Sequence, residues 1–375
     1  MNVIYRVILK IRHIVSHLLR CCCPRYFAYR VYTRAHQNHI CFYGGYDGKD
    51  MADYIDDSLQ IFLSKEQLAD KVFVKNTIID IILCHFKYGT NPTEYFCYGY
   101  PTKNDSERAT YLPRYQKDCL LVKQMHGKHQ TAFEFIKDKN AFYEAMKNFF
   151  RREACRVERK EDKKTFCELL YKCSRLMVKP TRGGCGSGIE IISLSDYESA
   201  EEAFDKLLAK GGYIAEEVVE QDPRIAKWNA SSLNTFRIPT FRTKDGVKIF
   251  YPSIRIGRAG SIVDNAGAGG TFAAIDAETG IIVSDGFDKH GHHYLEHPDS
   301  HIVYKGAQIP EWDALKSFVA EVHNAMPSEH KYIAYDMALS TRGWCVIEAN
   351  WGEVSMPQIE FGKGLKEEFE AMLFG

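Results

Sequence analysis

The residues best suited to hold a metal ion lie near the end of the sequence, in a predicted hairpin of two strands. Its first strand carries Asp336 and its second carries Glu348 and Asn350, with a turn at residues 341–343 between them. Glu348 and Asn350 are two residues apart, so their side chains share one face of the strand. Oxygen donors without a soft ligand nearby form the kind of set that Mg²⁺ prefers, although an ordinary acidic surface hairpin is the alternative.

Glu348 also follows the apolar run Trp344–Ile347. We therefore expect it at a core-facing strand end, where an unpaired carboxylate is costly. A bound cation would relieve that cost.

A second segment, residues 177–189, combines a lysine with a glycine-rich loop. A short apolar strand delivers Lys179, and the loop that follows contains Gly183, Gly184, Gly186, Ser187 and Gly188. Glycines let backbone N–H groups approach phosphate oxygens, and a lysine neutralises phosphate charge. The segment is neither a Walker loop nor a Rossmann GxGxxG motif. A glycine-rich hairpin without a ligand is the alternative.

A third segment is an apolar strand that begins at Tyr213 and ends in acidic residues. Its last residues are Glu216, Glu217, Val218, Val219 and Glu220. Such a strand could offer backbone hydrogen bonds to an adenine edge and a carboxylate to a ribose hydroxyl. Taken alone, it is more simply explained as a half-buried edge strand with solvated glutamates.

In order and spacing, the three segments resemble the ATP-grasp superfamily. Further motifs resemble its sugar-transfer associated subgroup: Asn234-Thr235-Phe236-Arg237, Ser253-Ile254-Arg255-Ile256-Gly257, Val263-Asp264-Asn265 with Gly269-Gly270, residues 275–280, His297-Pro298-Asp299 and residues 309–312. The resemblance runs from Phe135 to the C-terminus. It departs from the family at Arg151-Arg152-Glu153-Ala154, where a Gly-Ile-Pro-like turn is more usual. This departure leaves the exact boundary between the subdomains open.

The resemblance implies an α+β fold of the ATP-grasp type, in which two α+β subdomains clamp ATP, preceded by a helical N-terminal region. It implies that Lys179, the glycine loop and the segment 216–220 bind ATP, and that Asp336, Glu348 and Asn350 bind Mg²⁺. A second phosphate-contacting lysine is either Lys139 or Lys147, and the sequence does not choose between them.

The implied activity is a carboxylate–amine ligase that works through an acyl phosphate. Its substrates would be a saccharide-linked or amino-acid-type acid and an amine acceptor, within surface polysaccharide biosynthesis. Arg237 and Arg255 lie on strand-like runs, where they would stabilise the transferring phosphoryl group, or instead form structural salt bridges. A kinase acting on a hydroxyl acceptor and a non-catalytic nucleotide-binding scaffold are the alternatives. The intact set of Lys179 and metal ligands argues against the scaffold.

The elements that must position these residues divide the chain in two. We expect a mostly helical region at residues 1–125 and an ATP-grasp domain at residues 126–375, with a lid subdomain at about 175–220. Helices are predicted at Ser58–Leu68, Thr77–Phe86, two within Thr131–Arg151, Lys164–Cys173, Tyr197–Leu208 and Trp312–Met326. Strands are predicted at Leu176–Val178, Ile189–Ser193, Tyr213–Val219, Ile249–Tyr251, Thr271–Ile275, Ile281–Val283 and Val346–Ile347.

Composition argues against nucleic acid as a partner and against a zinc site. Basic and acidic residues both total 49, so no net charge favours nucleic acid. The twelve cysteines show no metal-ligand spacing, so a structural zinc site is not expected. A chain of this length can bury a full core without disulfides, so we expect reduced thiols and a cytoplasmic protein. The histidines at 290, 292, 293, 297 and 301 match no zinc pattern, and we interpret them as part of a polar loop.

Residues 1–23 form a predicted basic amphipathic helix. We favour packing of its apolar face on its own domain. The alternative is that residues 1–20 lie on the anionic inner face of a membrane. A cleaved signal peptide is disfavoured because Arg6, Lys10 and Arg12 interrupt any apolar core.

Overall fold

The structure, a computed structural model, describes residues 23–38, 40, 50–182, 188–264, 267, 269–352 and 354–375. Contacts divide the chain into two compact units: one ends at Leu120 and includes Gly362–Glu367, and the other comprises Leu121–Phe361 and Glu368–Gly375. The predicted N-terminal helix lies outside the described residues except for Cys23, which is exposed. Within the described ranges, no helix is long and apolar enough to cross a membrane.

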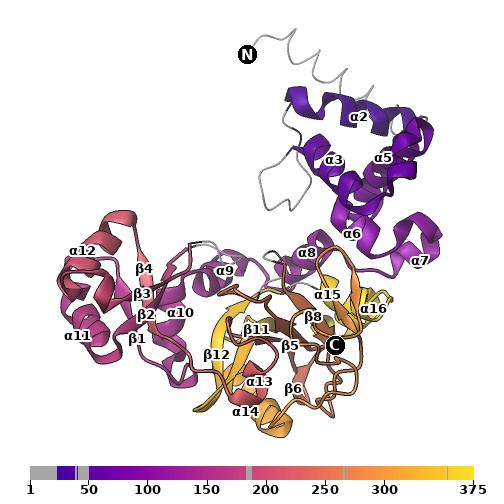
Figure 1. Cartoon of the computed structure of the whole chain (residues 1–375). Helices are drawn as coiled ribbons and strands as arrows, with labels where there is room; N and C mark the ends of the chain where they lie inside the picture. The colour runs from indigo at the N-terminus through magenta and orange to yellow at the C-terminus, as the bar shows by residue number, and fades with distance from the viewer. Residues whose placement is uncertain are drawn as a thin grey trace. The chain divides into compact units, whose positions relative to one another are not determined.

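The first unit is built of helices (Figure 1). They are α2 (Pro24–Asn38), α3 (Met51–Phe62), α4 (Lys65–Ala69), α5 (Lys71–Tyr88), α6 (Pro92–Cys97), η1 (Tyr100–Thr102), α7 (Asp105–Ala109) and α8 (Arg114–Gln124), which reaches into the second unit. The predicted helix at residues 77–86 is confirmed within α5. A single helix at residues 58–68 is wrong, because Leu63 is extended and Ser64 caps a new helix in a capping box with Gln67.

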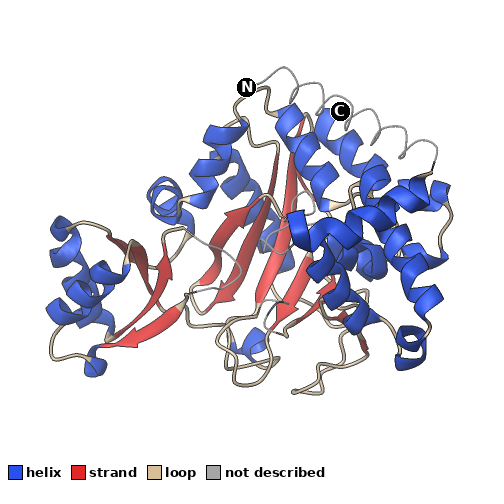
Figure 2. Ribbon diagram, turned by 90° about the horizontal axis from the view of Figure 1, so that it is seen from above, coloured by secondary structure: helices blue, strands red, loops and turns tan. Residues whose placement is uncertain are grey.

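The second unit contains a four-stranded antiparallel sheet in the order β1-β4-β2-β3. Its strands are β1 (Ala154–Val157), β2 (Arg175–Pro180), β3 (Glu190–Ser193) and β4 (Tyr213–Glu217). Helices α11 (Lys163–Cys173) and α12 (Ala200–Lys210) cover one face of this sheet (Figure 2). Phe166 and Phe204 of these helices join the core there. The small sheet and the helices that cover it thus begin at Ala154. Strand β1 and helix α11 both precede the predicted lid range of about 175–220.

A larger sheet of eight strands follows, in the order β10-β9-β8-β7-β5-β11-β12 with β6 paired to β5. Its strands are β5 (Thr235–Thr243), β6 (Gly246–Ile249), β7 (Ser253–Ile256), β8 (Thr271–Ala274), β9 (Gly286–Phe287), β10 (His293–Tyr294), β11 (Tyr332–Ser340) and β12 (Gly343–Asn350). The strand predicted at residues 281–283 is wrong, because Ile281 and Ile282 make only isolated bridges. The strand predicted at residues 249–251 ends at Ile249, and Tyr251 is left-handed.

The remaining helices of the described chain are α9 (His129–Lys137), α10 (Lys139–Met146), α13 (Pro223–Ala226), α14 (Trp312–Ala325), α15 (Ser355–Glu360) and α16 (Lys366–Phe374), with short 3₁₀ turns at Lys147–Phe149, Lys160–Asp162 and Leu194–Asp196. The α9–α10 pair and the predicted helices α11 and α14 are confirmed. One face of the large sheet packs on α14 through Phe236, Tyr335 and Leu315. Because side chains alternate along a strand, Arg237 and Asp336 lie on the opposite face.

Candidate functional site

Lys179 lies on the face of the small sheet that α11 and α12 leave open. Antiparallel pairing sets Met177 of β2 opposite Glu216 of β4, so Lys179 is the diagonal neighbour of Glu216. Its Nζ lies 3.0 Å from Oε1 and 3.0 Å from Oε2 of Glu216. The carboxylate is almost fully buried, and the lysine side chain is 12% exposed. The structure therefore brings together residues from two of the predicted nucleotide-binding segments.

A second cation, Arg152, contacts the same carboxylate. Its Nε donates to Oε2 of Glu216 at 2.7 Å, and its Nη2 lies 2.6 Å from that oxygen. Burial raises the pKa of Glu216, but the charges of Arg152 and Lys179 outweigh burial and lower it overall. Glu216 is therefore ionised and shared by two cations. The sequence interpretation missed Arg152, although the signal was present as a charged pair where a Gly-Ile-Pro-like turn is usual.

Glu348 reaches the Asp336 face of the large sheet through a β-bulge in β12. Asp336 pairs with Glu348, but Met337 pairs with Val346, so Ile347 is an extra residue in this strand. Val346 and Ala349 both lie in the core, and Glu348 between them is exposed. The expectation of a core-facing Glu348 is therefore wrong, because the bulge reverses the alternation and turns its carboxylate toward Asp336.

Asp336 is a buried carboxylate held between two arginines. Nε of Arg237, its partner across from β5, lies 2.7 Å from Oδ1. Nη2 of Arg255 donates to Oδ2 at 3.0 Å. Burial raises the pKa of Asp336, but the two guanidinium charges outweigh burial, and the pKa is lowered overall. Asp336 is therefore ionised.

Glu348 has the opposite behaviour. Enclosure by the surrounding protein and then the negative charge of Asp336 raise the pKa of Glu348 to about 7, although its side chain still meets solvent. The third predicted ligand, Asn350, shares this face, and its Oδ1 accepts hydrogen bonds from Arg237 Nη1 at 2.7 Å and Gly352 N at 2.6 Å. The hairpin thus brings the three predicted metal ligands together.

These three residues fit a Mg²⁺ ion by the chemistry of their donors. All three offer hard oxygen donors, and two carboxylates that face each other across paired strands repel, as the raised pKa of Glu348 reflects. A divalent cation would relieve that repulsion. Over the described part of the chain, no three His, Cys, Asp or Glu side chains could hold a metal. In the predicted site Asn350 would be the third donor beside Asp336 and Glu348, in place of one of the two hydrogen bonds that its Oδ1 accepts here.

Arg255 is anchored in a second set of contacts behind Asp336. Its Nε and Nη2 donate to Thr235 Oγ1 at 3.1 and 2.9 Å, and Nη2 lies 3.4 Å from Oδ1 of Asp264. Asp264 is buried and accepts a hydrogen bond from Thr235 N at 2.8 Å. Arg237 and Arg255 therefore make the salt bridges considered from the sequence, and they make them directly to a candidate metal ligand.

The structure distinguishes between the two candidate lysines. Lys139, at the start of α10, is half-buried. Burial lowers the pKa of Lys139, Glu348 opposes that shift, and Lys179 adds to it, so Lys139 lies within electrostatic reach of both parts of the site. Lys147 is exposed. We therefore propose Lys139 as the second phosphate-contacting lysine.

The other predicted nucleotide-binding residues fall into two groups. Gly183, Gly184, Gly186 and Ser187 lie outside the described residues. Gly188 has a φ of 72°, and an added Cβ would come within 2.9 Å of Pro180, so this position requires glycine.

The acidic end of the third segment turns partly toward the large sheet. The carboxylate of Glu217 pairs with Arg342, whose Nη1 donates at 2.9 Å. Glu220 accepts a hydrogen bond from Thr341 N at its backbone oxygen, at 3.0 Å. Val218 and Val219 are partly exposed after β4 ends. The Glu217 side chain is therefore committed to an ion pair, whereas the neighbouring Glu216 faces Lys179.

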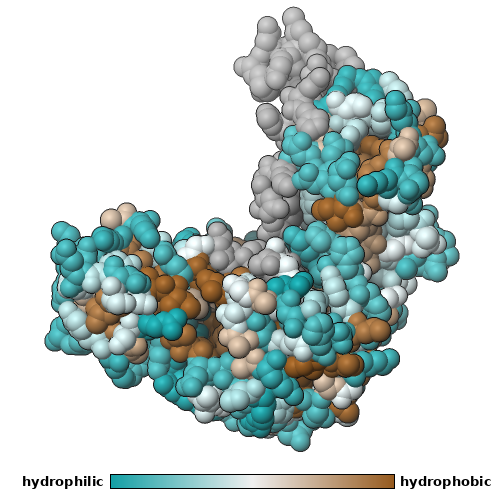
Figure 3. Space-filling model, viewed as in Figure 1, coloured by the Kyte–Doolittle hydropathy of each residue, from teal (hydrophilic) through white to brown (hydrophobic). Residues whose placement is uncertain are grey.

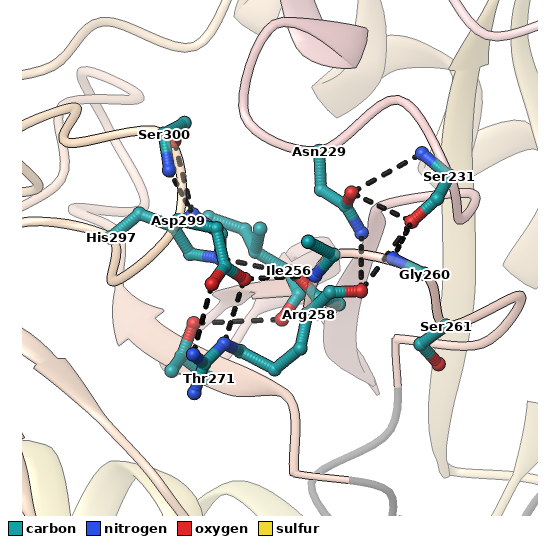
Figure 4. Close-up of polar contacts among 12 residues, drawn as sticks. Asn229, Ser231, Ile256, Arg258, Gly260, Ser261, Thr271, His297, Asp299 and Ser300 are labelled. Carbon is teal, nitrogen blue, oxygen red and sulfur yellow. Dashed lines mark hydrogen bonds and ion pairs between the residues drawn. The ribbon is translucent and has the colours of Figure 1, made fainter.

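The histidine-rich loops make structural contacts (Figure 4). His297 is fully buried, and its ring nitrogens lie 3.1 Å from Gly257 O and 3.0 Å from Ser300 Oγ. Arg258 donates from Nε to Asp299 at 2.7 Å. These contacts fix the start of the loop that follows β7. Three other histidines contact a carboxylate: His292 contacts Asp288, His293 contacts Asp285 and His301 contacts Glu296. The backbone N–H of His290 donates to the carboxylate of Asp288.

Comparison with known proteins gives one family. The sequence matches the family described as sugar-transfer associated ATP-grasp over residues 124–372. No curated protein matched the chain.

Among solved structures, D-alanyl-alanine synthetase A from Vibrio cholerae O1 biovar eltor is 12% identical, with 67% of each chain covered and a TM-score of 0.39. The ATP-grasp ligase PsnB, complexed with minimal precursor, is 10% identical over 72% of this chain and 69% of that chain, with a TM-score of 0.40. D-alanine–D-alanine ligase from Bacillus anthracis, complexed with ATP, is 13% identical over 64% of each chain, with a TM-score of 0.36.

Proposed function

Because the chain belongs to the sugar-transfer associated ATP-grasp family, we propose that it is a MgATP-dependent ligase that joins a carboxylate to an amine. The observation that carries the proposal is the pair of charge clusters in one compact unit. Lys179 and Arg152 share Glu216 on the small sheet, and Asp336, Glu348 and Asn350 share one face of the large sheet. A nucleotide polyphosphate and its metal need these two kinds of environment.

Lys179 and Lys139 bind the phosphates of ATP in this proposal, and the glycine loop supplies backbone N–H groups. The adenine ring lies against the open face of the small sheet, where Met177 and Ile191 are partly exposed. Figure 3 shows hydrophobic surface over the part of the second unit formed by β2 and β4. An apolar surface beside a charged cluster suits a nucleotide, which has an apolar base and an anionic tail.

Asp336, Glu348 and Asn350 hold Mg²⁺, which supplies charge neutralisation of the phosphates when bound. Arg237 and Arg255 keep two further positive charges beside the ligands, where a phosphoryl group is transferred. The work of the side chains is to position reactants and stabilise charge, and no residue acts as a covalent nucleophile.

The reaction has two steps. A carboxylate oxygen of the acid substrate attacks the γ-phosphorus of ATP, the bond from that phosphorus to the β–γ bridging oxygen breaks, and ADP leaves. The amine nitrogen then attacks the acyl carbon, the carbon–oxygen bond to phosphate breaks, and inorganic phosphate leaves. The amine loses one proton to solvent. We propose a saccharide-linked or amino-acid-type acid as the substrate, in surface polysaccharide assembly, on the basis of the family.

Phosphate release from MgATP by the full chain tests the proposal, with pools of sugar acids and amines added singly and together. Release that requires both an acid and an amine is the expected result. Release with a hydroxyl acceptor alone would make the protein a kinase. Binding of ATP without release in any pool would favour a nucleotide-binding scaffold.

A further inference from the structure

We infer that Arg152 is a positioning residue for nucleotide binding, which shares the Glu216 carboxylate with Lys179 and so keeps the lysine charge available to the ATP phosphates. The inference rests on the proposed MgATP site. It concerns a residue at the position where the sequence departs from its family.

The charge balance of this cluster carries the inference. A buried lysine paired with one carboxylate forms a neutral pair, which attracts a polyphosphate weakly. Here Arg152 and Lys179 contact the same carboxylate at 2.6 to 3.0 Å, so one unit of positive charge remains. Arg152 is 7% exposed, and its side chain is more deeply buried than that of Lys179. The excess charge is therefore presented through Lys179, the more exposed partner.

The geometry of Arg152 also separates the roles of the two carboxylate oxygens. Nε and Nη2 of Arg152 both approach Oε2 of Glu216, whereas Lys179 lies 3.0 Å from Oε1 as well as 3.0 Å from Oε2. Both nitrogens of Arg152 thus converge on one oxygen, Oε2, and leave Oε1 to Lys179. The Lys179 ammonium is therefore held by an oxygen that Arg152 does not occupy.

A further contact links Arg152 to the metal-binding strand. Its Nη1 donates to Val346 O at 2.7 Å, and this residue directly precedes the bulge that turns Glu348 to the site. Arg152 thus joins the small sheet to β12 at the one position where the alternation of that strand changes. The positions of the phosphate-binding lysine and the metal ligand depend on the same guanidinium.

A double-mutant cycle on the full chain tests the charge argument, with the dissociation constants of MgATP and adenosine measured by calorimetry. Arg152→Met should weaken MgATP binding about tenfold or more, because Glu216 then neutralises Lys179 alone. Adenosine lacks phosphates, so its affinity should change less than about twofold. Arg152→Met combined with Glu216→Gln should restore MgATP binding to within about threefold of the unaltered chain, because Lys179 is again unneutralised.

Arg151→Met is the matched control, since Arg151 is exposed and donates to Arg342 O but does not contact Glu216. It should leave both affinities unchanged. Failure of Glu216→Gln to restore MgATP binding, or an equal loss of adenosine binding, would overturn the inference and leave Arg152 a structural residue.

Thermal denaturation shows whether each variant folds. If Arg152→Met is unfolded, Arg152→Lys, which keeps the charge, and the double variant take its place, and both should bind MgATP within about threefold of the unaltered chain. A tenfold loss in both would contradict the charge argument. Absence of MgATP binding by the unaltered chain would instead reject the proposed function, so the two failures are distinguishable.

Discussion

Glu216 on the small sheet and Asp336 on the large sheet are both buried carboxylates that contact two cationic side chains. Around Glu216 the cations outnumber the acids, and the pKa of Glu216 is lowered against the effect of burial. Around Asp336 a second carboxylate, Glu348, faces it across the strand, and the pKa of Glu348 is raised to about 7. The same kind of buried group thus lies among excess cations in the small sheet and among excess acids in the large sheet, where Glu348 and Asp264 are two added carboxylates. In our proposal the first cluster binds the ATP phosphates and the second binds Mg²⁺.

The largest expected effect comes from removing the Glu348 carboxylate of the large sheet. Glu348→Ala should lower ATP turnover by about a hundredfold or more, because the metal loses one of three donors. A steady-state phosphate-release assay measures the change. Glu321→Ala, on the exposed side of α14, is the control and should turn over ATP normally. Normal turnover by Glu348→Ala would remove this residue from the metal site.

Loss of the Lys179 cation beside Glu216, in the small sheet, should have the next largest effect. Lys179→Ala removes the charge presented to the phosphates, and we expect the dissociation constant of MgATP to rise about tenfold to a hundredfold. Lys139→Ala should have a smaller effect in the same direction, and Lys147→Ala, at an exposed lysine, should have none. An equal loss in Lys139→Ala and Lys147→Ala would contradict the assignment of Lys139.

The two clusters should also differ in their response to pH. Glu348 must lose its proton to bind a cation, and its pKa lies at about 7, so Mg²⁺ affinity should fall by up to about tenfold for each pH unit below 7. Above about pH 8 the affinity should be constant. Titration of Mg²⁺ in the presence of a non-hydrolysable ATP analogue measures this dependence.

The lowered pKa of Glu216 predicts no such change in the small sheet. Adenosine binding, which depends on that sheet alone in our proposal, should be constant between pH 6 and pH 8. A Mg²⁺ affinity that is equally constant over this range would mean that Glu348 is ionised without the metal, in conflict with its environment.

The smallest effect is expected at the partly exposed ion pair beside Glu216. Glu217→Gln removes the pairing with Arg342, a contact worth about 1 kcal/mol or less in such a setting, and should change MgATP affinity less than about twofold. Calorimetric titration compares it with Glu216→Gln. A tenfold loss in Glu217→Gln would assign its carboxylate to the nucleotide, as the sequence alone suggested.

The sequence was sufficient to predict the family and the α+β ATP-grasp fold, both of which are confirmed. The sequence singled out Lys179 and the acidic hairpin because each combines a reactive residue type with a distinctive neighbour, a glycine loop or a strand–turn–strand pattern. Their roles in binding stay predictions. The orientation of Glu348 was not readable, because a one-residue bulge reverses the alternation and has no sequence signal of its own here. The break between α3 and α4 was missed for a related reason: apolar spacing continues across the Ser64 cap.

Arg152 was harder to predict, since it acts through residues distant in the sequence. Arg152 contacts Glu216, 64 residues away, and Val346, 194 residues away. A single sequence contains no information on such pairs until the topology of both sheets is known. The charged residues at positions 151–153 were visible as a departure from the family, but their partner was not.

The pairing of β5 with β11 has a consequence for how the protein is made. Arg237 and Asp336 are 99 residues apart, and β12 directly follows β11. During synthesis β5 emerges long before the strand that covers its edge, so that edge stays unpaired while the intervening residues are added. Contacts of such high sequence separation form slowly and expose nascent chains to aggregation. Asp336, Glu348 and Asn350 thus join Arg237 late, and the edge of β5 stays open to other partners until β11 has emerged.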